Sequence, residues 1–159
     1  MSPLIRLSAA LTGALLLCAP SLAQDAPGAE TPETNSHEAA IRAAVMDYFE
    51  GGNDGDSQRV AGAFETEVGD MFIRRPDETG ADTVMAMNLG EFAARLSDPI
   101  PVERIGEIEE TRIADDRMAF VHFAFTTPDR QYDDFFVLYR LGDDWKIVSK
   151  AFTVEPVEE

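Results

Sequence analysis

The residue of this sequence best suited to acid–base chemistry is His122, which lies in the apolar C-terminal part of the chain. An unperturbed imidazole titrates near neutral pH, so it can accept and donate a proton under physiological conditions. Two carboxylates, Asp133 and Asp134, follow it after a short turn sequence. A histidine paired with one of them would form a proton-transfer pair. The structural alternative is a packed histidine that is satisfied by a neighbouring carboxylate.

The length of the loop at Pro128–Asp129 decides which carboxylate lies near His122. A loop of two or four residues places His122 opposite Phe135, with Asp133 on the same face of the hairpin. A loop of three or five residues places Asp134 opposite His122 instead. Both pairings remain open, and either one brings a carboxylate close to the imidazole.

Three further side chains are candidates for ligand binding. Tyr48 and Tyr139 offer hydroxyl groups to a pocket, and Arg74 could hold an anionic substrate. The structural alternatives are amphipathic core positions for the tyrosines and a surface charge for the arginine.

The sequence lacks the ligand sets of common metal and cofactor sites. Cys18 is the only cysteine and lies near the N-terminus, so no thiolate cluster can form. The acidic turn Asn53–Asp56 does not have the ligand spacing of a calcium loop and is better explained as a helix cap. Glycine-rich phosphate loops, dinucleotide fingerprints and nucleophile elbows are absent as well. We therefore expect no metal and no cofactor.

The chain is strongly acidic. It carries 30 acidic and 13 basic residues, with a formal net charge of −17. A surface of this sign opposes binding to nucleic acid and to anionic lipid, and it favours neutral or cationic ligands. Such a surface also keeps a protein soluble. We expect no nucleic-acid partner.

The first 23 residues have the pattern of a signal peptide. Arg6 precedes an apolar run over residues 7–19, and small residues lead up to Ala23, after which we predict cleavage. The apolar run is shorter than the ~20 residues that a membrane-spanning helix needs. A lipid anchor at Cys18 is disfavoured because leucines, rather than small residues, precede it. We expect a periplasmic or secreted protein with no membrane insertion after cleavage.

The sequence after the leader predicts a linker followed by helices. Residues 24–34 are rich in Pro, Glu and Thr without apolar periodicity, which predicts disorder. A helix should begin at Asn35 or Ser36 and end at Gly51-Gly52, since apolar residues between them recur at helical spacing. The next expected elements are a short helix after the turn 53–56, a strand over Val68–Arg75, a helix capped by Asn88 and stopped by Pro99 and Pro101, and a strand over Val102–Ile113 with a bulge near Gly106.

The segment Met118–Phe152 predicts three antiparallel strands, separated by turns at 127–130 and 142–144. Phe123 has the opposite strand parity from His122, and apolar residues occur on both parities of the next strand. Both faces of this sheet are therefore apolar, and the helices can cover only one of them. We expect the second face to form a homodimer. Residues 155–159 are expected to be an acidic tail.

The element order predicts an α+β domain over residues 35–154. Two segments are distinctive: Asp134–Lys150, DFFVLYRLGDDWKIVSK, and Tyr48–Asp56, YFEGGNDGD. They resemble segments of nuclear transport factor 2-like proteins, and particularly of the branch described as putative lumazine-binding. The resemblance covers residues 38–152. It implies a cone in which three helices pack on a strongly curved antiparallel sheet around a pocket.

The resemblance implies a pocket without a catalytic motif. This fold hosts isomerases, dehydratases and hydrolases as well as binding and dimerisation modules. We therefore predict an exported domain that binds a small apolar or aromatic molecule, or a partner protein. The alternative is an enzyme of the isomerase or dehydratase type that uses His122 with Asp133 or Asp134.

Overall fold

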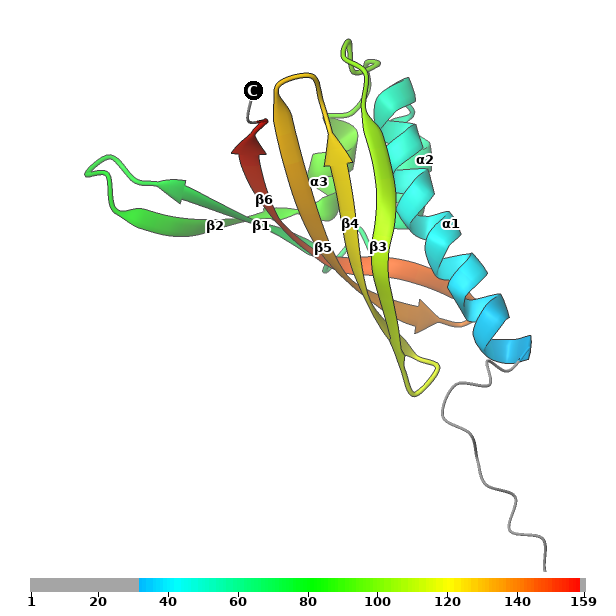
Figure 1. Cartoon of the computed structure of the whole chain (residues 1–159). Helices are drawn as coiled ribbons and strands as arrows, with labels where there is room; N and C mark the ends of the chain where they lie inside the picture. The colour runs from blue at the N-terminus through cyan, green and yellow to red at the C-terminus, as the bar shows by residue number, and fades with distance from the viewer. Residues whose placement is uncertain (1–31, 158–159) are drawn as a thin grey trace, which may run out of the picture.

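A computed structural model describes residues 32–157, which form three helices and six strands (Figure 1). The predicted signal peptide and its cleavage site lie outside the described residues, as does most of the predicted linker. Within the described residues, no helix is both long and apolar enough to span a membrane.

Helix α1 spans Pro32–Asp54, so it begins three residues before the predicted start and continues through the two glycines predicted to end it. Helix α2, Ser57–Ala63, packs back against α1. A Cβ atom on Gly51 would lie 3.0 Å from Cγ2 of Val60, at the limit of contact. Gly51 therefore serves the close approach of the two helices rather than the end of α1.

Both shorter helices begin at side-chain caps. Asp56 precedes α2 and accepts a hydrogen bond from the backbone N–H of Arg59 at 2.9 Å. Asn88 precedes α3, Leu89–Ala94, and accepts hydrogen bonds from the backbone N–H groups of Gly90 and Glu91. The predicted cap at Asn88 is confirmed, because an Asn side chain at this position satisfies amides that have no helical partner.

The six strands form one sheet with the order β2-β1-β6-β5-β4-β3. Neighbouring strands are antiparallel except β1 and β6, which are parallel. The strands are β1 Asp70–Pro76, β2 Asp82–Asn88, β3 Ile105–Ala114, β4 Met118–Thr126, β5 Arg130–Leu141 and β6 Asp144–Pro156. The predicted α+β class with helices on a curved sheet is confirmed, whereas β2 is an addition that the sequence patterns did not predict.

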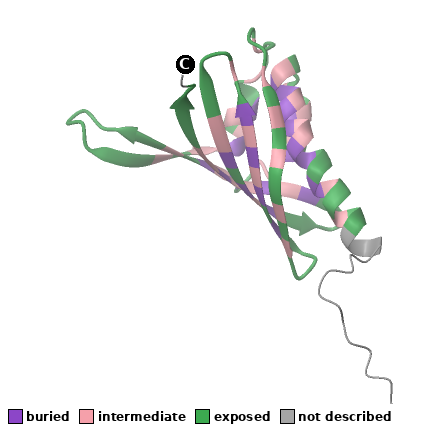
Figure 2. Cartoon of the chain, viewed as in Figure 1, coloured by how far each residue is buried: buried purple, intermediate pink, exposed green. Residues whose placement is uncertain are grey.

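The helices cover one side of the curved sheet, and the β1–β2 hairpin projects from its edge (Figure 1). We call the side that faces the helices the inner face and the opposite side the outer face. Buried residues concentrate on the inner face and on the helix surfaces turned toward it, whereas the end of the hairpin is exposed (Figure 2). Phe123 on the inner face packs against α1, where the centroid of its ring lies 4.9 Å from that of Phe49.

Gly106 has a different role from the predicted one. The register of β3 against β4 shifts between Ile108 and Glu110, two residues beyond the expected position of the bulge. A Cβ atom on Gly106 would lie 2.5 Å from Cζ of Phe123. Glycine is therefore needed because an aromatic ring of the core packs against the backbone of β3.

The β4–β5 hairpin settles the register that the sequence left open. The backbone N–H of Thr127 donates to the carbonyl of Arg130 at 2.8 Å, so the loop contains two residues. His122 is opposite Phe135, and Phe123 is opposite Asp134. Because strand side chains alternate between faces, Asp133 and Asp134 point to opposite sides of the sheet.

Candidate ligand-binding cavity

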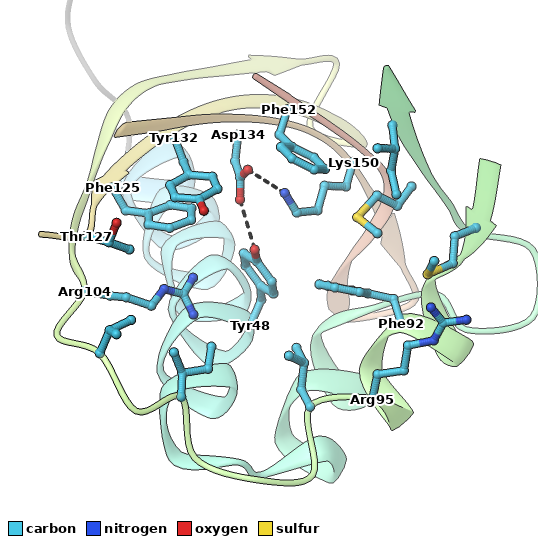
Figure 3. Close-up of a pocket in the computed structure, with 16 residues that line it drawn as sticks. Tyr48, Phe92, Arg95, Arg104, Phe125, Thr127, Tyr132, Asp134, Lys150 and Phe152 are labelled. Atoms are coloured by element: carbon cyan, nitrogen blue, oxygen red, sulfur yellow. Dashed lines mark hydrogen bonds and ion pairs between the residues drawn. The ribbon is translucent and has the colours of Figure 1, made fainter. Parts of the chain in front are cut away.

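A cavity of about 460 Å³ lies between the inner face of the sheet and the helices (Figure 3). Ligand pockets in proteins typically have volumes of about 300–1,000 Å³. Most of the lining side chains are aliphatic, aromatic or thioether groups, and four are charged. The lining residues are Tyr48, Met71, Ile73, Met87, Phe92, Arg95, Leu96, Ile100, Val102, Arg104, Phe125, Thr127, Tyr132, Asp134, Lys150 and Phe152.

Regular elements position the polar groups of the cavity. Helix α1 presents Tyr48, which has the helical spacing of the buried residues around it. Strand β5 presents Tyr132 and Asp134, and β6 presents Lys150. Asp134 and Lys150 both occupy inner positions of their strands, so their side chains meet inside the domain.

These elements bring together a buried tyrosine, carboxylate and ammonium group. Asp134 and Lys150 are only 1% and 3% exposed. Lys150 Nζ lies 2.5 Å from Oδ1 of Asp134, and the Tyr48 hydroxyl donates a hydrogen bond to Oδ2 at 3.0 Å (Figure 3). Oδ1 therefore has an ion-pair partner, although that contact lacks hydrogen-bond geometry, and Oδ2 has a hydrogen-bond donor. A buried charge is tolerated when it is paired in this way.

The environment shifts the protonation equilibria of two of these groups. Burial, reinforced by the negative charge of Asp134, raises the pKa of Tyr48 well above its usual value, although the nearby Arg104 opposes the rise. Burial lowers the pKa of Lys150, and the carboxylate of Asp134 opposes that change. The tyrosine therefore stays neutral at physiological pH and donates a hydrogen bond to the carboxylate.

Arg104 occupies another wall of the cavity. Its guanidinium carbon lies 4.6 Å from the ring centroid of Phe49 and 4.4 Å from that of Phe125. Cation–π contacts of this kind fix the position of a guanidinium without neutralising it. Its Nε is buried and has no hydrogen-bond partner among the described residues.

The cavity contains some of the predicted site residues but not His122. Tyr48 and Asp134 line it. His122 and Asp133 lie on the outer face, where His122 Nε2 and Asp133 Oδ1 are 2.6 Å apart. The imidazole also stacks on Phe135 with ring centroids 4.6 Å apart. The sheet therefore separates the His122–Asp133 pair from the cavity.

The other two candidates lie away from the cavity lining. Arg74 is on the exposed β1–β2 hairpin and forms an ion pair with Asp82. Tyr139 is on the outer face and is 44% exposed. Arg74 is therefore a surface charge, and Tyr139 is an aromatic residue of the outer face.

Two charged residues of the cavity, Lys150 and Arg104, were missed at the sequence level. Strand alternation would have placed Lys150 on the outer face, because Trp145 and Ile147 are buried at the opposite parity. A register shift of β6 against β5, between Val137 and Leu138, brings Lys150 to the inner face instead. Arg104 follows two prolines and adjoins a strand, so its neighbours gave no indication that its stem packs between aromatic rings. Among the described residues, no group of three or more His, Cys, Asp or Glu side chains is arranged to hold a metal ion.

The sequence of residues 36–153 matches the model of the family described as "Putative lumazine-binding". No curated protein matches the chain. A nuclear transport factor 2-like protein of unknown function from Silicibacter pomeroyi is similar in structure, with a TM-score of 0.63 and 19% identity over 77% of this chain and 98% of that one.

Two further solved structures have the same fold. A ketosteroid isomerase-like protein from Erwinia carotovora atroseptica has a TM-score of 0.55 and 17% identity, over 79% of this chain and 99% of that one. A protein described as a putative scytalone dehydratase from Novosphingobium aromaticivorans has a TM-score of 0.59 and 11% identity, over 82% and 93%. At such identities the likeness establishes the fold alone. The solved structures therefore give this chain the nuclear transport factor 2-like fold. Since the family model spans most of the sequence, the chain belongs to the Putative lumazine-binding family.

Proposed function

We propose that this protein binds a small, largely aromatic or apolar molecule in the cavity. The observation that carries the proposal is the lining itself: a space of about 460 Å³ walled by aromatic, aliphatic and methionine side chains with a few buried polar groups. Apolar walls supply affinity, and a few fixed polar groups orient the ligand. The family description directs attention to flat heteroaromatic ligands such as lumazine.

A fluorescence titration tests this proposal. The neutral dye N-phenyl-1-naphthylamine emits strongly in apolar surroundings and is expected to bind the wild-type protein. Met87 lines the cavity. Met87→Trp replaces its side chain with a bulky indole ring, which should fill part of the cavity and weaken dye binding. Dye binding that Met87→Trp leaves unchanged, or no binding at all, would contradict the proposal. Lumazine itself is tested by its displacement of the dye.

A second candidate function is proton transfer of the isomerase or dehydratase type. It is favoured by Asp134, a carboxylate that lines an apolar cavity beside the hydroxyl of Tyr48. The His122–Asp133 pair is the other candidate, on the outer face. Isomerisation of a β,γ-unsaturated ketosteroid by wild type, Asp134→Asn and His122→Gln distinguishes them. The variant that loses activity while its circular dichroism spectrum shows it folded identifies the site, and an inactive wild type rejects this reaction.

We also propose that the outer face forms a homodimer. Met118, Phe120 and Phe135 are exposed on this face although they are large and apolar. Covering such residues removes apolar surface from water. Sedimentation of the wild type should give twice the mass of the chain, and Phe120→Glu should shift it toward the monomer because the new charge would be buried in the interface. A wild-type protein that sediments as a monomer contradicts the proposal.

The predicted leader supports a further proposal, that the protein is exported and cleaved after Ala23. Mass spectrometry of protein isolated from its host should then find Gln24 at the N-terminus. An intact Met1 on soluble cytoplasmic protein would contradict export.

A further inference from the structure

The charges that line the cavity have the opposite sign from the charge of the whole chain. The sequence carries a formal net charge of −17. The cavity lining, in contrast, contains three cations, Arg95, Arg104 and Lys150, and one carboxylate, Asp134. Because Lys150 is paired with Asp134, two guanidinium groups remain, and no carboxylate of the described chain forms an ion pair with either. The cavity is therefore a positive site within an acidic protein.

The position of Arg104 is fixed by aromatic rings rather than by an acidic neighbour. Its guanidinium rests against the rings of Phe49 and Phe125. Figure 3 shows it directed into the cavity toward Tyr48. The end of the guanidinium, rather than the inaccessible Nε, faces the cavity, and its N–H groups can donate hydrogen bonds to an acceptor bound there.

The cations also act on one another. Besides burial, the charge of Arg104 contributes to the lowered pKa of Lys150, so the two groups are close enough to repel. A negatively charged group in the cavity would offset this repulsion. It would gain charge-assisted hydrogen bonds from a guanidinium, whose planar fork matches a carboxylate or a similar acid.

We propose that the cavity ligand is an aromatic or apolar acid whose anionic group is bound by Arg104, with Arg95 as a second cation on the lining. This inference rests on the proposed function, since it names the class of molecule that the cavity takes. The body of the ligand contacts the apolar walls, and its acid group lies against the guanidinium of Arg104.

Two dyes with the same aromatic body test the inference. 8-Anilinonaphthalene-1-sulfonate carries one sulfonate, and N-phenyl-1-naphthylamine lacks it. The wild type should bind the sulfonate more tightly, although the charge of the whole protein opposes anions. Arg104→Gln should weaken sulfonate binding about tenfold or more, because a hydrogen bond to a charged group is lost. Binding of the neutral dye should change less than about twofold, because its contacts are apolar.

Matched variants complete the design. Arg74→Gln removes the same charge from the exposed hairpin and should leave the binding of both dyes unchanged. Arg104→Lys keeps the charge and should retain more sulfonate affinity than Arg104→Gln. The inference is overturned if Arg104→Gln leaves sulfonate binding intact, if it weakens both dyes equally, or if Arg74→Gln has the same effect. A wild type that binds neither dye refutes the proposed function itself, whereas normal binding of the neutral dye without selectivity for the sulfonate refutes only this inference.

Discussion

Asp133 and Asp134 are adjacent in sequence, yet the side chain of each contacts a basic residue in a different environment. Asp133 lies on the outer face beside His122, and their side chains are 31% and 28% exposed. Asp134 lies on the inner face beside Lys150, and both are almost completely buried. The two contacts have nearly equal lengths, 2.6 Å and 2.5 Å. Burial, rather than distance, must therefore determine how much each pair matters.

The physical reason lies in the solvent. In the single chain, water screens the outer pair and can solvate either partner when the other is removed, so such pairs contribute little to stability. The inner pair has no such replacement, and loss of one partner leaves an uncompensated charge in the domain. Substitutions in the inner pair should therefore lower the free energy of unfolding much more than substitutions in the outer pair.

The largest effect is expected for Lys150→Met. The substitution keeps the apolar stem of the side chain but leaves Asp134 as an unpaired buried charge, which should lower the free energy of unfolding by about 3–5 kcal/mol. Equilibrium denaturation in urea measures it. Lys146→Met, on the same strand but at the surface, is the matched control and should change stability far less. The double variant Asp134→Asn/Lys150→Met should regain part of the lost stability, because it removes the unpaired buried charge. Equal losses of stability in Lys150→Met and Lys146→Met would contradict the comparison of the two faces.

Tyr48→Phe should have an intermediate effect. It removes the hydrogen bond to Oδ2 of Asp134 and should reduce the free energy of unfolding by about 1–3 kcal/mol. Tyr139→Phe alters a tyrosine on the outer face and serves as its control. If both variants melt at the same temperature, the Tyr48 hydroxyl does not stabilise the buried pair.

The same variant should also change the pH dependence of stability. The pKa of Tyr48 is higher in the folded protein than the usual 10.0, so its contribution is fully present below pH 10.0 and is lost as the pH rises toward the folded value. The stability difference between wild type and Tyr48→Phe should therefore shrink above pH 10.0. Denaturation curves recorded at several alkaline pH values measure this difference, and a gap that widens would show that the assigned direction is wrong.

The smallest effect is expected for His122→Gln. Because both partners of the outer pair are partly exposed in the single chain, the variant should lose less than about 1 kcal/mol of stability at protein concentrations that keep the chain monomeric. Asp133→Asn should behave in the same way. A loss in the monomer comparable with that of Lys150→Met would contradict the comparison. A larger loss only at concentrations where the protein is dimeric would instead agree with burial of the outer pair in the proposed interface.

The sequence predicted the elements whose local chemistry is strong. Asn88 could be identified as a helix cap because its side chain satisfies adjacent amides, and the β4–β5 turn because Pro and Asp favour it. Strand β2 was missed because it lies at the sheet edge, where most of its side chains are exposed and no apolar alternation is needed. Local patterns report what a segment buries, and this segment buries little.

The candidate site depended on two registers, that of β4 against β5 and the shifted one of β5 against β6. Once the hairpin loop has two residues, strand parity places Asp134 inside and His122 outside. The sequence left that loop length open, so the pairing of Asp134 with Lys150 could not be predicted. Arg104 depends on a long-range approach of α1 and β4, which no pattern in its own neighbourhood records.

The mixed pairing of the sheet has a consequence for its motions. Strand β1 pairs with β6 over three residues only, Asp70–Phe72, and beyond them the hairpin is paired only with itself. Ile73 and Met87 nevertheless form part of the cavity wall. A two-stranded ribbon held by so short a ladder opens at a lower free energy than the centre of a sheet. Amide protons beyond Ile73 should therefore exchange with solvent deuterium well before those of β4 and β5, so this wall belongs to the least protected part of the sheet.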